Sequence, residues 1–96
     1  MKVEVLETAL DDLADGYYFY ENQSEGLGSY FIDTLWSDID SLCIFAGVHE
    51  IHNDYYRLLS KRFPYAVYYE ITNDVAHIYA ILDCRRNPTW IRSRLT

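Results

Sequence analysis

Cysteine is scarce in this sequence, which contains two cysteines among 96 residues. Cys43 lies within an apolar helical pattern, and Cys84 lies beside two arginines. Nothing in this arrangement calls for a disulfide. We therefore expect two free thiols in a reducing cytosol, and the class of small secreted proteins held together by disulfides is excluded.

Long apolar segments are also missing. The longest runs from 43 to 48 and is far shorter than the roughly 20 residues that cross a bilayer. The first six residues carry Lys2 and Glu4, where a secretory signal peptide needs an unbroken apolar stretch. No repeat or Pro/Gly/Ser-rich linker divides the chain. We expect a soluble cytoplasmic protein without membrane contact, folded as a single domain over residues 1–96.

Basic residues are almost absent from the first half of the chain. Residues 1–54 hold twelve acidic side chains and only Lys2 as a base, a net charge of −11. Residues 55–96 hold three acidic and seven basic side chains, a net charge of +4. Such a division predicts that the two halves contact different partners. The basic half is expected to present a local anion-binding face although the whole chain carries −7.

What the chain does have is hydrophobic periodicity typical of an α+β fold. Half of its residues are hydrophobic and 17% are aromatic, which is enough to build a core. Alternation at Val3 and Val5 predicts a strand, and apolar residues at helical spacing then predict two helices in a hairpin. The predicted order is β-α-α-β-β-β-(α), with the helical hairpin on one face of a mainly antiparallel sheet. The predicted elements are a strand at Lys2 to Val5, helices over 8–21 and 26–46, strands over 55–60, 65–71 and 75–82, and a terminal helix over 88–95.

Several residues define the expected ends and faces of these elements. Thr8 precedes Asp11 by three positions, which indicates an N-cap, and Gly47 is expected to end the second helix. Residues 48–54 read as a polar loop, and residues 72–74 supply the turn of a hairpin. The first helix is expected to pack through Leu10, Leu13, Ala14, Tyr17 and Tyr18, with its acids Asp11, Asp12 and Asp15 turned away. The second is expected to pack through Phe31, Leu35, Ile39, Leu42 and Cys43.

Three motifs then point to a known family. They are the segment from Tyr20 to Phe31 with its Gly-Leu-Gly, the segment from Arg57 to Tyr69 with its Arg-Phe-Pro-Tyr, and the segment from Asp83 to Pro88 with its Arg-Arg-x-Pro. Together and in this order they resemble the RelE/ParE superfamily of toxins from type II toxin–antitoxin systems, also called plasmid stabilisation proteins. The resemblance implies the fold described above, a cytoplasmic bacterial protein, and a cognate antitoxin as partner.

The family contains two chemical classes. One class cuts messenger RNA in the ribosome, and the other binds and inhibits DNA gyrase. The pattern of the RNA-cutting class is retained at Arg57 and Arg85. It is lost at Leu59 and Ala66, and the late tyrosine falls near Ile91 with Trp90 adjacent. A histidine common before Arg-Arg is replaced by Asp83, which would repel a phosphate unless it pairs with Arg85 or Arg86. The resemblance therefore favours the ParE-like branch.

The candidate site residues follow from this comparison. For binding a target or an anion they are Arg57, Arg62, Arg85, Arg86 and Trp90. If the protein is a ribonuclease, the catalytic set is Arg57, Lys61, Arg62 and Arg85. The alternative for each arginine is an ordinary ion pair, and for Arg62 it is a carboxylate on the helices.

Other chemistry finds little support. His49, Glu50, His52 and Asp54 share a polar loop, but a metal site needs three or four ligands in fixed geometry, and no metal is expected. His77 reads as a hydrogen-bonded histidine in a strand. There is no phosphate-binding glycine loop or dinucleotide fingerprint, so neither a cofactor nor a small-molecule substrate is expected.

Three functions therefore compete. The first is a ParE-like toxin that inhibits growth by binding a cellular target such as DNA gyrase and is neutralised by its antitoxin. The second is a ribosome-dependent messenger RNA endonuclease, with the ribosome and messenger RNA as partners. The third is a non-toxic relic that only binds an antitoxin. In each case the acidic half predicts a basic stretch on the antitoxin.

Overall fold

The computed structural model describes residues 1–96 and consists of five strands and four helices. In chain order these are β1 (Lys2–Val5), α1 (Glu7–Glu21), α2 (Leu27–Asp40), α3 (Leu42–Phe45), β2 (Ile51–His52), β3 (Tyr55–Leu59), β4 (Tyr65–Thr72), β5 (Val75–Asp83) and α4 (Pro88–Arg94). The predicted α+β class and the predicted order are confirmed, with β2 and α3 as additions.

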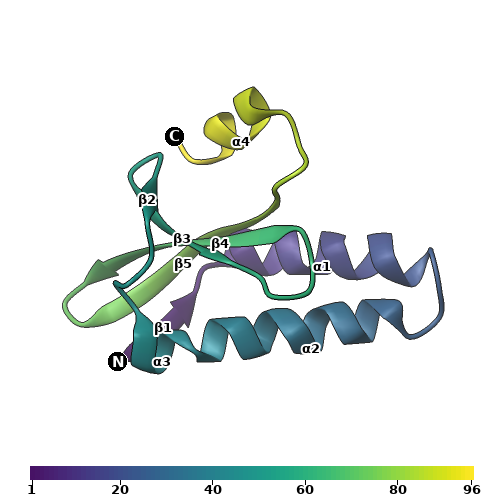
Figure 1. Cartoon of the computed structure of the whole chain (residues 1–96), viewed down its shortest axis with the longest axis horizontal. Helices are drawn as coiled ribbons and strands as arrows, with labels where there is room; N and C mark the ends of the chain where they lie inside the picture. Colours follow the sequence, from purple (N-terminus) through teal and green to yellow (C-terminus); the bar gives the residue numbers. More distant parts are fainter.

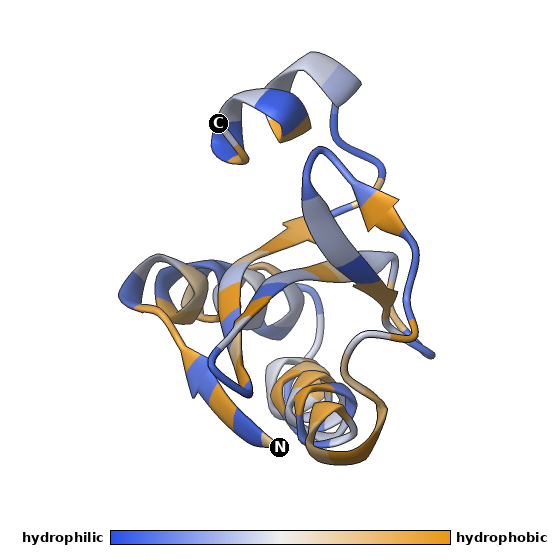
Figure 2. Cartoon of the chain, turned by 90° about the vertical axis from the view of Figure 1, so that its left-hand side faces the viewer, coloured by the Kyte–Doolittle hydropathy of each residue, from blue (hydrophilic) through white to orange (hydrophobic).

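The strands form one sheet in the order β1-β5-β4-β3-β2. β1 pairs with β5 in parallel, and every other pair is antiparallel. The helical hairpin of α1 and α2 covers one face of this sheet, as predicted, while α4 lies over the other face (Figure 1). Figure 2 shows the sheet between the helical hairpin and α4, with many hydrophobic residues along its strands.

The hairpin turns explain why β2 exists. Asn73 and Asp74 join β4 to β5 with φ values of 52° and 62°, the left-handed conformation that asparagine and aspartate tolerate in two-residue turns. Asn53 and Asp54 repeat this chemistry with φ values of 54° and 71° and join β2 to β3. The prediction that residues 48–54 form a loop was wrong for its last four residues, because Ile51 and His52 form β2 and Asn53-Asp54 forms the turn of another hairpin.

A β-bulge in β5 decides which side chains meet the helices. Tyr68 lies opposite Ala80 and Tyr69 lies opposite Ile78, so Tyr79 is an extra residue in β5. A bulge shifts the alternation of faces by one residue. As a result Ile78 and Ile81 both pack in the core beneath the hairpin, whereas Ala80 packs on the α4 side.

The break between α1 and α2 is organised by one carboxylate. Glu21 accepts hydrogen bonds from the backbone N–H of Gly26 (3.0 and 3.1 Å) and of Gly28 (2.9 Å). It thereby caps the first turn of α2, where N–H groups lack partners within the helix. Gly28 permits the close contact of the two helices, because a Cβ there would lie 2.7 Å from the backbone oxygen of Tyr17.

The core beneath the hairpin is rich in aromatic side chains. Tyr20 packs against Phe31 and Phe63 with ring centroids 5.1 and 4.8 Å apart, and Tyr65 packs against Phe31 at 4.9 Å. Burial raises the pKa of Tyr65 to about 12. Tyr65, Tyr68 and Tyr69 of β4 are all buried and pack on the two faces of the sheet.

Three details of α1 differ from the prediction. α1 begins at Glu7 with Leu6 as its N-cap, so Thr8 does not cap it and instead donates its hydroxyl to Tyr79 O at 3.0 Å. The buried face consists of Ala9, Asp12, Leu13, Gly16 and Tyr20. Leu10, Ala14 and Tyr18 are exposed although they were expected in the core.

The second predicted helix is interrupted. α2 ends at Asp40, and the short α3 follows Ser41. Phe31, Leu35, Ile39 and Leu42 are buried as predicted, whereas Cys43 is exposed. No helix of this chain has both the length and the apolar character needed to cross a membrane.

Candidate functional site

The terminal helix α4 creates both hollows of interest. Its Leu95 is buried in a small core with Ala66, Tyr68, Ala80 and Leu82, and Trp90 packs against the same core. A short helix held over a sheet leaves a hollow on each side. One lies between α4 and α1, and the other lies between α4 and the β2–β3 hairpin.

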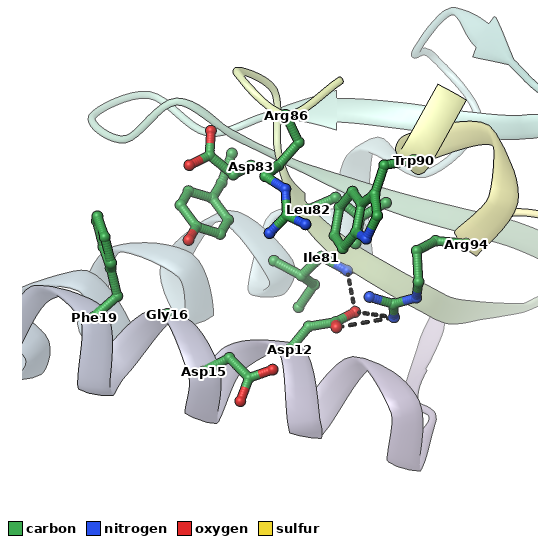
Figure 3. A pocket seen from close by; sticks show the side chains of 11 residues that line it. Asp12, Asp15, Gly16, Phe19, Ile81, Leu82, Asp83, Arg86, Trp90 and Arg94 are labelled. Atoms are coloured by element: carbon green, nitrogen blue, oxygen red, sulfur yellow. Dashed lines mark hydrogen bonds and ion pairs between the residues drawn. The ribbon is translucent and has the colours of Figure 1, made fainter. Parts of the chain in front are cut away.

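The first hollow, which we call the α1–α4 cleft, has a volume of about 300 Å³ and is shown in Figure 3. Its lining residues come from α1, from the β4–β5 pair and from the C-terminal segment: Asp12, Asp15, Gly16, Phe19, Tyr65, Ile81, Leu82, Asp83, Arg86, Trp90 and Arg94.

Asp12 ties three elements together at one end of this cleft. Its Oδ2 accepts the backbone N–H of Ile81 at 3.0 Å, and Nη2 of Arg94 lies 2.9 Å from both carboxylate oxygens (Figure 3). Burial raises the pKa of Asp12, against the lowering effects of the Ile81 N–H and of Arg94. The prediction that Asp12 faces away from the core was wrong, because β5 needs a partner for the Ile81 N–H.

Two other charged groups of the cleft, Asp83 and Arg86, are engaged locally. Asp83 accepts hydrogen bonds from Nε and Nη2 of Arg85 at 3.0 and 2.8 Å, and this contact lowers the pKa of Asp83. Asp83 thus pairs with Arg85, one of the two arginines whose pairing would keep this carboxylate from repelling a phosphate. The guanidinium of Arg86 lies 3.7 Å from the centroid of the Trp90 ring, a cation–π contact.

The second hollow, which we call the arginine pocket, has a volume of about 250 Å³. Its lining contains no carboxylate and consists of His52, Asn53, Arg57, Tyr68, Cys84, Arg86, Pro88, Ile91 and Arg92. Because three arginines and no carboxylate line it, this pocket favours anions. The Nε of Arg57 is buried and has no hydrogen-bond partner.

The remaining polar groups of the arginine pocket differ in their ability to move a proton. Burial raises the pKa values of Tyr68 and of Cys84, so the phenol and the thiol are both protonated near neutral pH. His52, whose imidazole can both donate and accept a proton, lies 3.3 Å from Glu50 through its Nε2.

The structure brings together only part of the predicted site. Arg57 and Arg86 both line the arginine pocket, and Trp90 lies beneath Arg86. Arg62 lies elsewhere and donates to the hydroxyl of Tyr30 on α2 at 2.8 Å. The expected carboxylate partner of Arg62 was therefore wrong, since its partner is a phenol.

Arg85 and Lys61 also lie outside the arginine pocket. Arg85 is held by Asp83, and Lys61 is exposed between β3 and β4. The predicted ribonuclease set of Arg57, Lys61, Arg62 and Arg85 is thus not assembled around one cavity.

Two lining residues were not predicted. His52 was considered only as a metal ligand, and the repeated Asn-Asp turn is the signal that places it on a strand beside Arg57. Arg92 is two residues from both Trp90 and Arg94, so it projects from another side of α4. The helical spacing of residues 88–94 could have shown that Arg92 lies on another side of α4 than Trp90 and Arg94.

Comparisons with known proteins bear on the fold. A chain of the chromosomal ParDE TA system from P. aeruginosa superposes on this chain with a TM-score of 0.72 and 18% sequence identity, covering 84% of this chain and 92% of that chain. No family model matches the sequence, and the search of curated proteins returned no match. The fold is therefore that of the RelE/ParE toxins, as the three sequence motifs implied.

Proposed function

We propose that this protein is the toxin component of a type II toxin–antitoxin pair, of the ParE-like kind, which acts by binding its target and is neutralised by a cognate antitoxin. The observation that carries the proposal is the fold shared with a chain of a ParDE TA system. The proposed place of action is the bacterial cytoplasm, and the proposed target is DNA gyrase.

The placement of the arginines supports binding over cutting. A ribonuclease must hold the scissile phosphate, stabilise developing charge and move a proton within one cavity. Of the four predicted catalytic residues only Arg57 lines the arginine pocket. Arg85 is neutralised by Asp83, and Arg62 contacts Tyr30.

The test is induction of this chain without an antitoxin, followed by a supercoiling assay with purified gyrase. Growth arrest, a DNA-damage response and slower supercoiling are expected. The variant Arg86→Ala should weaken the inhibition, whereas Lys61→Ala, which removes an exposed charge outside the arginine pocket, should not. Unchanged supercoiling at saturating protein would rule out gyrase as the target.

A second candidate function is favoured by one observation. The arginine pocket combines three guanidinium groups with His52, which are groups that a ribosome-dependent messenger RNA endonuclease needs. In that case induction produces codon-positioned cuts in translated messages, and both Arg57→Ala and His52→Ala abolish them. Intact messages in growth-arrested cells would exclude this function.

Harmless overexpression of a folded protein would exclude both activities. It would favour the third possibility, a relic that binds an antitoxin and has no target of its own.

A further inference from the structure

The arginine pocket is lined by cationic side chains that no acidic group of this chain pairs with. Arg57, Arg86 and Arg92 line it. The arginines that form ion pairs are instead Arg85 and Arg94. Positive charges gathered without counterions repel one another and favour an anion between them. The compensating charge must therefore come from outside the chain.

Arg57 is the member of this set that the fold holds most firmly. It is half-buried on β3, directly opposite Tyr68 of β4. Burial raises the pKa values of Tyr68 and Cys84, and the charge of Arg57 acts on both in the opposite direction. The cation of Arg57 therefore lies close to two other lining side chains, in a place where an uncompensated charge is costly.

Arg92 and Arg86 bring further charge from the side of α4, and both are exposed. Nη2 of Arg92 lies 3.2 Å from the hydroxyl of Thr89. Since a guanidinium has five N–H donors, this one contact leaves Arg92 with donors for a ligand. Arg86 lines both hollows, and its guanidinium lies against the Trp90 ring. Its charge therefore acts on a ligand in the arginine pocket from one side.

The rest of the lining suits an anion that has an organic part. His52 and Asn53 of the β2–β3 hairpin add an imidazole and a side-chain amide, which are further possible donors. Pro88 and Ile91 add apolar surface. The volume of about 250 Å³ fits a small molecule and is too small for a folded partner.

A phosphate monoester matches this lining better than the other common anions do. It carries nearly two negative charges near neutral pH and has three acceptor oxygens, so donors from several elements can each find an acceptor. A carboxylate has two oxygens, which a single arginine fork satisfies. A phosphodiester chain brings further negative charges with it, and the net charge of −7 opposes their approach.

We infer that the arginine pocket is a binding site for a small phosphate monoester. Arg57 and Arg92 hold the phosphate group, Arg86 adds to the positive charge, and Pro88 and Ile91 contact the organic part. This inference goes beyond the proposed function and does not rest on it, because such binding is a property of the chain alone.

The inference is tested by calorimetry on the full chain at 0.05 and 0.5 M salt. The probes are inorganic phosphate, uridine 5′-monophosphate, O-phosphoserine, the phosphodiester uridylyl-uridine, and acetate. At least one of the two monoesters should bind about 10-fold more tightly than the phosphodiester and acetate, a difference of about 1.4 kcal/mol. Binding should weaken at high salt because ions screen exposed charges.

The two monoesters distinguish the sources of the phosphate group. Tighter binding of uridine 5′-monophosphate indicates a nucleotide, and tighter binding of O-phosphoserine indicates a phosphorylated side chain. Binding of inorganic phosphate but of neither monoester would overturn the inference, and so would equal or tighter binding of the phosphodiester or of acetate.

Variants locate the bound phosphate. Arg57→Gln and Arg92→Gln should each weaken binding of the preferred monoester by about 10-fold, or about 1.4 kcal/mol. Arg92 is exposed, so its variant keeps the test decisive if Arg57→Gln fails to fold. Lys61→Gln is the matched control, because it removes one positive charge at an exposed position outside the arginine pocket. Equal weakening by Lys61→Gln would overturn the inference in favour of attraction to overall charge.

Growth arrest separates this inference from the proposed function. If the chain binds a phosphate monoester as described but arrests no growth when it is induced, the proposed toxic function fails and the phosphate site stands. If the chain arrests growth and binds no phosphate monoester, the phosphate site fails alone.

Discussion

The two halves of this chain differ in how they use charge. Residues 1–54 carry −11, and six of their twelve acidic side chains are exposed on the helical hairpin without ion-pair partners. Residues 55–96 carry +4 and gather Arg57, Arg86 and Arg92 around one pocket that lacks carboxylates. The two halves therefore present surfaces of opposite charge.

A few polar contacts join the two halves, and they differ in how deeply they are buried. The buried Asp12 meets the half-buried Arg94, the half-buried His49 meets the hydroxyl of the buried Tyr69, and Tyr30 meets Arg62 at the surface. Because polar contacts matter more when water is excluded, breaking them one at a time shows how firmly the acidic hairpin is held on the basic half.

The largest effect is expected from Asp12→Ala. This change leaves the Ile81 N–H and Arg94 without their shared partner in a buried place, and such losses cost about 3 kcal/mol. Urea unfolding should show this decrease in the free energy of unfolding. Asp15→Ala, which removes an exposed carboxylate from the same cleft, is the control and should change stability by less than about 0.5 kcal/mol. Equal effects would mean that the Asp12 contacts do not hold the halves together.

Gly28→Ala tests packing inside the acidic hairpin and should cost about 2 kcal/mol. The added Cβ would lie 2.7 Å from the backbone oxygen of Tyr17, so the helices must separate. Ser29→Ala changes the neighbouring exposed residue, and we expect it to leave the thermal midpoint nearly unchanged. A neutral Gly28→Ala would show that the helices can move apart at little cost.

A smaller, pH-dependent effect is expected from His49. Burial lowers the pKa of His49 below its ordinary 6.5, and its Nδ1 meets the hydroxyl of Tyr69, which also accepts the Gly47 N–H at 2.9 Å. The unfolded chain then binds more protons than the folded chain near this pH. The His49 contribution is therefore present above pH 6.5 and is lost as the pH falls through the lowered pKa.

Unfolding measured between pH 5 and pH 8 should show this loss in the unmodified chain and a shallower loss in His49→Gln. His77→Gln is the control, since His77 lies on another strand with Glu4 3.7 Å away. An identical pH profile for the unmodified chain and His49→Gln would contradict the expected role of His49.

The smallest effect is expected from Tyr30→Phe. It removes the hydroxyl that accepts from Arg62 at the surface, and exposed contacts of this kind contribute less than about 1 kcal/mol. A double-mutant cycle with Arg62→Ala should give a coupling energy below about 0.5 kcal/mol. A larger coupling would make this surface contact comparable to the buried one at Asp12.

Periodicity was sufficient for much of the fold and insufficient for the faces of α1. The stripe of Leu10, Ala14 and Tyr18 was predicted to be buried because apolar spacing indicates a face but does not say what covers it. The buried side of α1 instead contains Ala9, Asp12 and Gly16. Gly16 was decisive, because a Cβ there would lie 2.5 Å from the ring of Phe31.

The candidate site was predicted in part for a similar reason. Arg57 and Arg86 were identified from motifs, yet their meeting in one pocket depends on the pairing of β3 with β4 and on α4 lying over the sheet. His52 joins them only because the Asn53-Asp54 turn folds β2 back onto β3.

By itself the sequence determined the class of fold, the order of the elements, the family motifs and the opposite charges of the two halves. All of these depend on local spacing and composition, which are properties of the sequence and do not depend on the tertiary structure. Only the tertiary structure decided which apolar stripe is buried, that Asp12 is paired under the sheet, and which arginines share a pocket. These depend on contacts between residues far apart in the chain, and local patterns do not encode such distances.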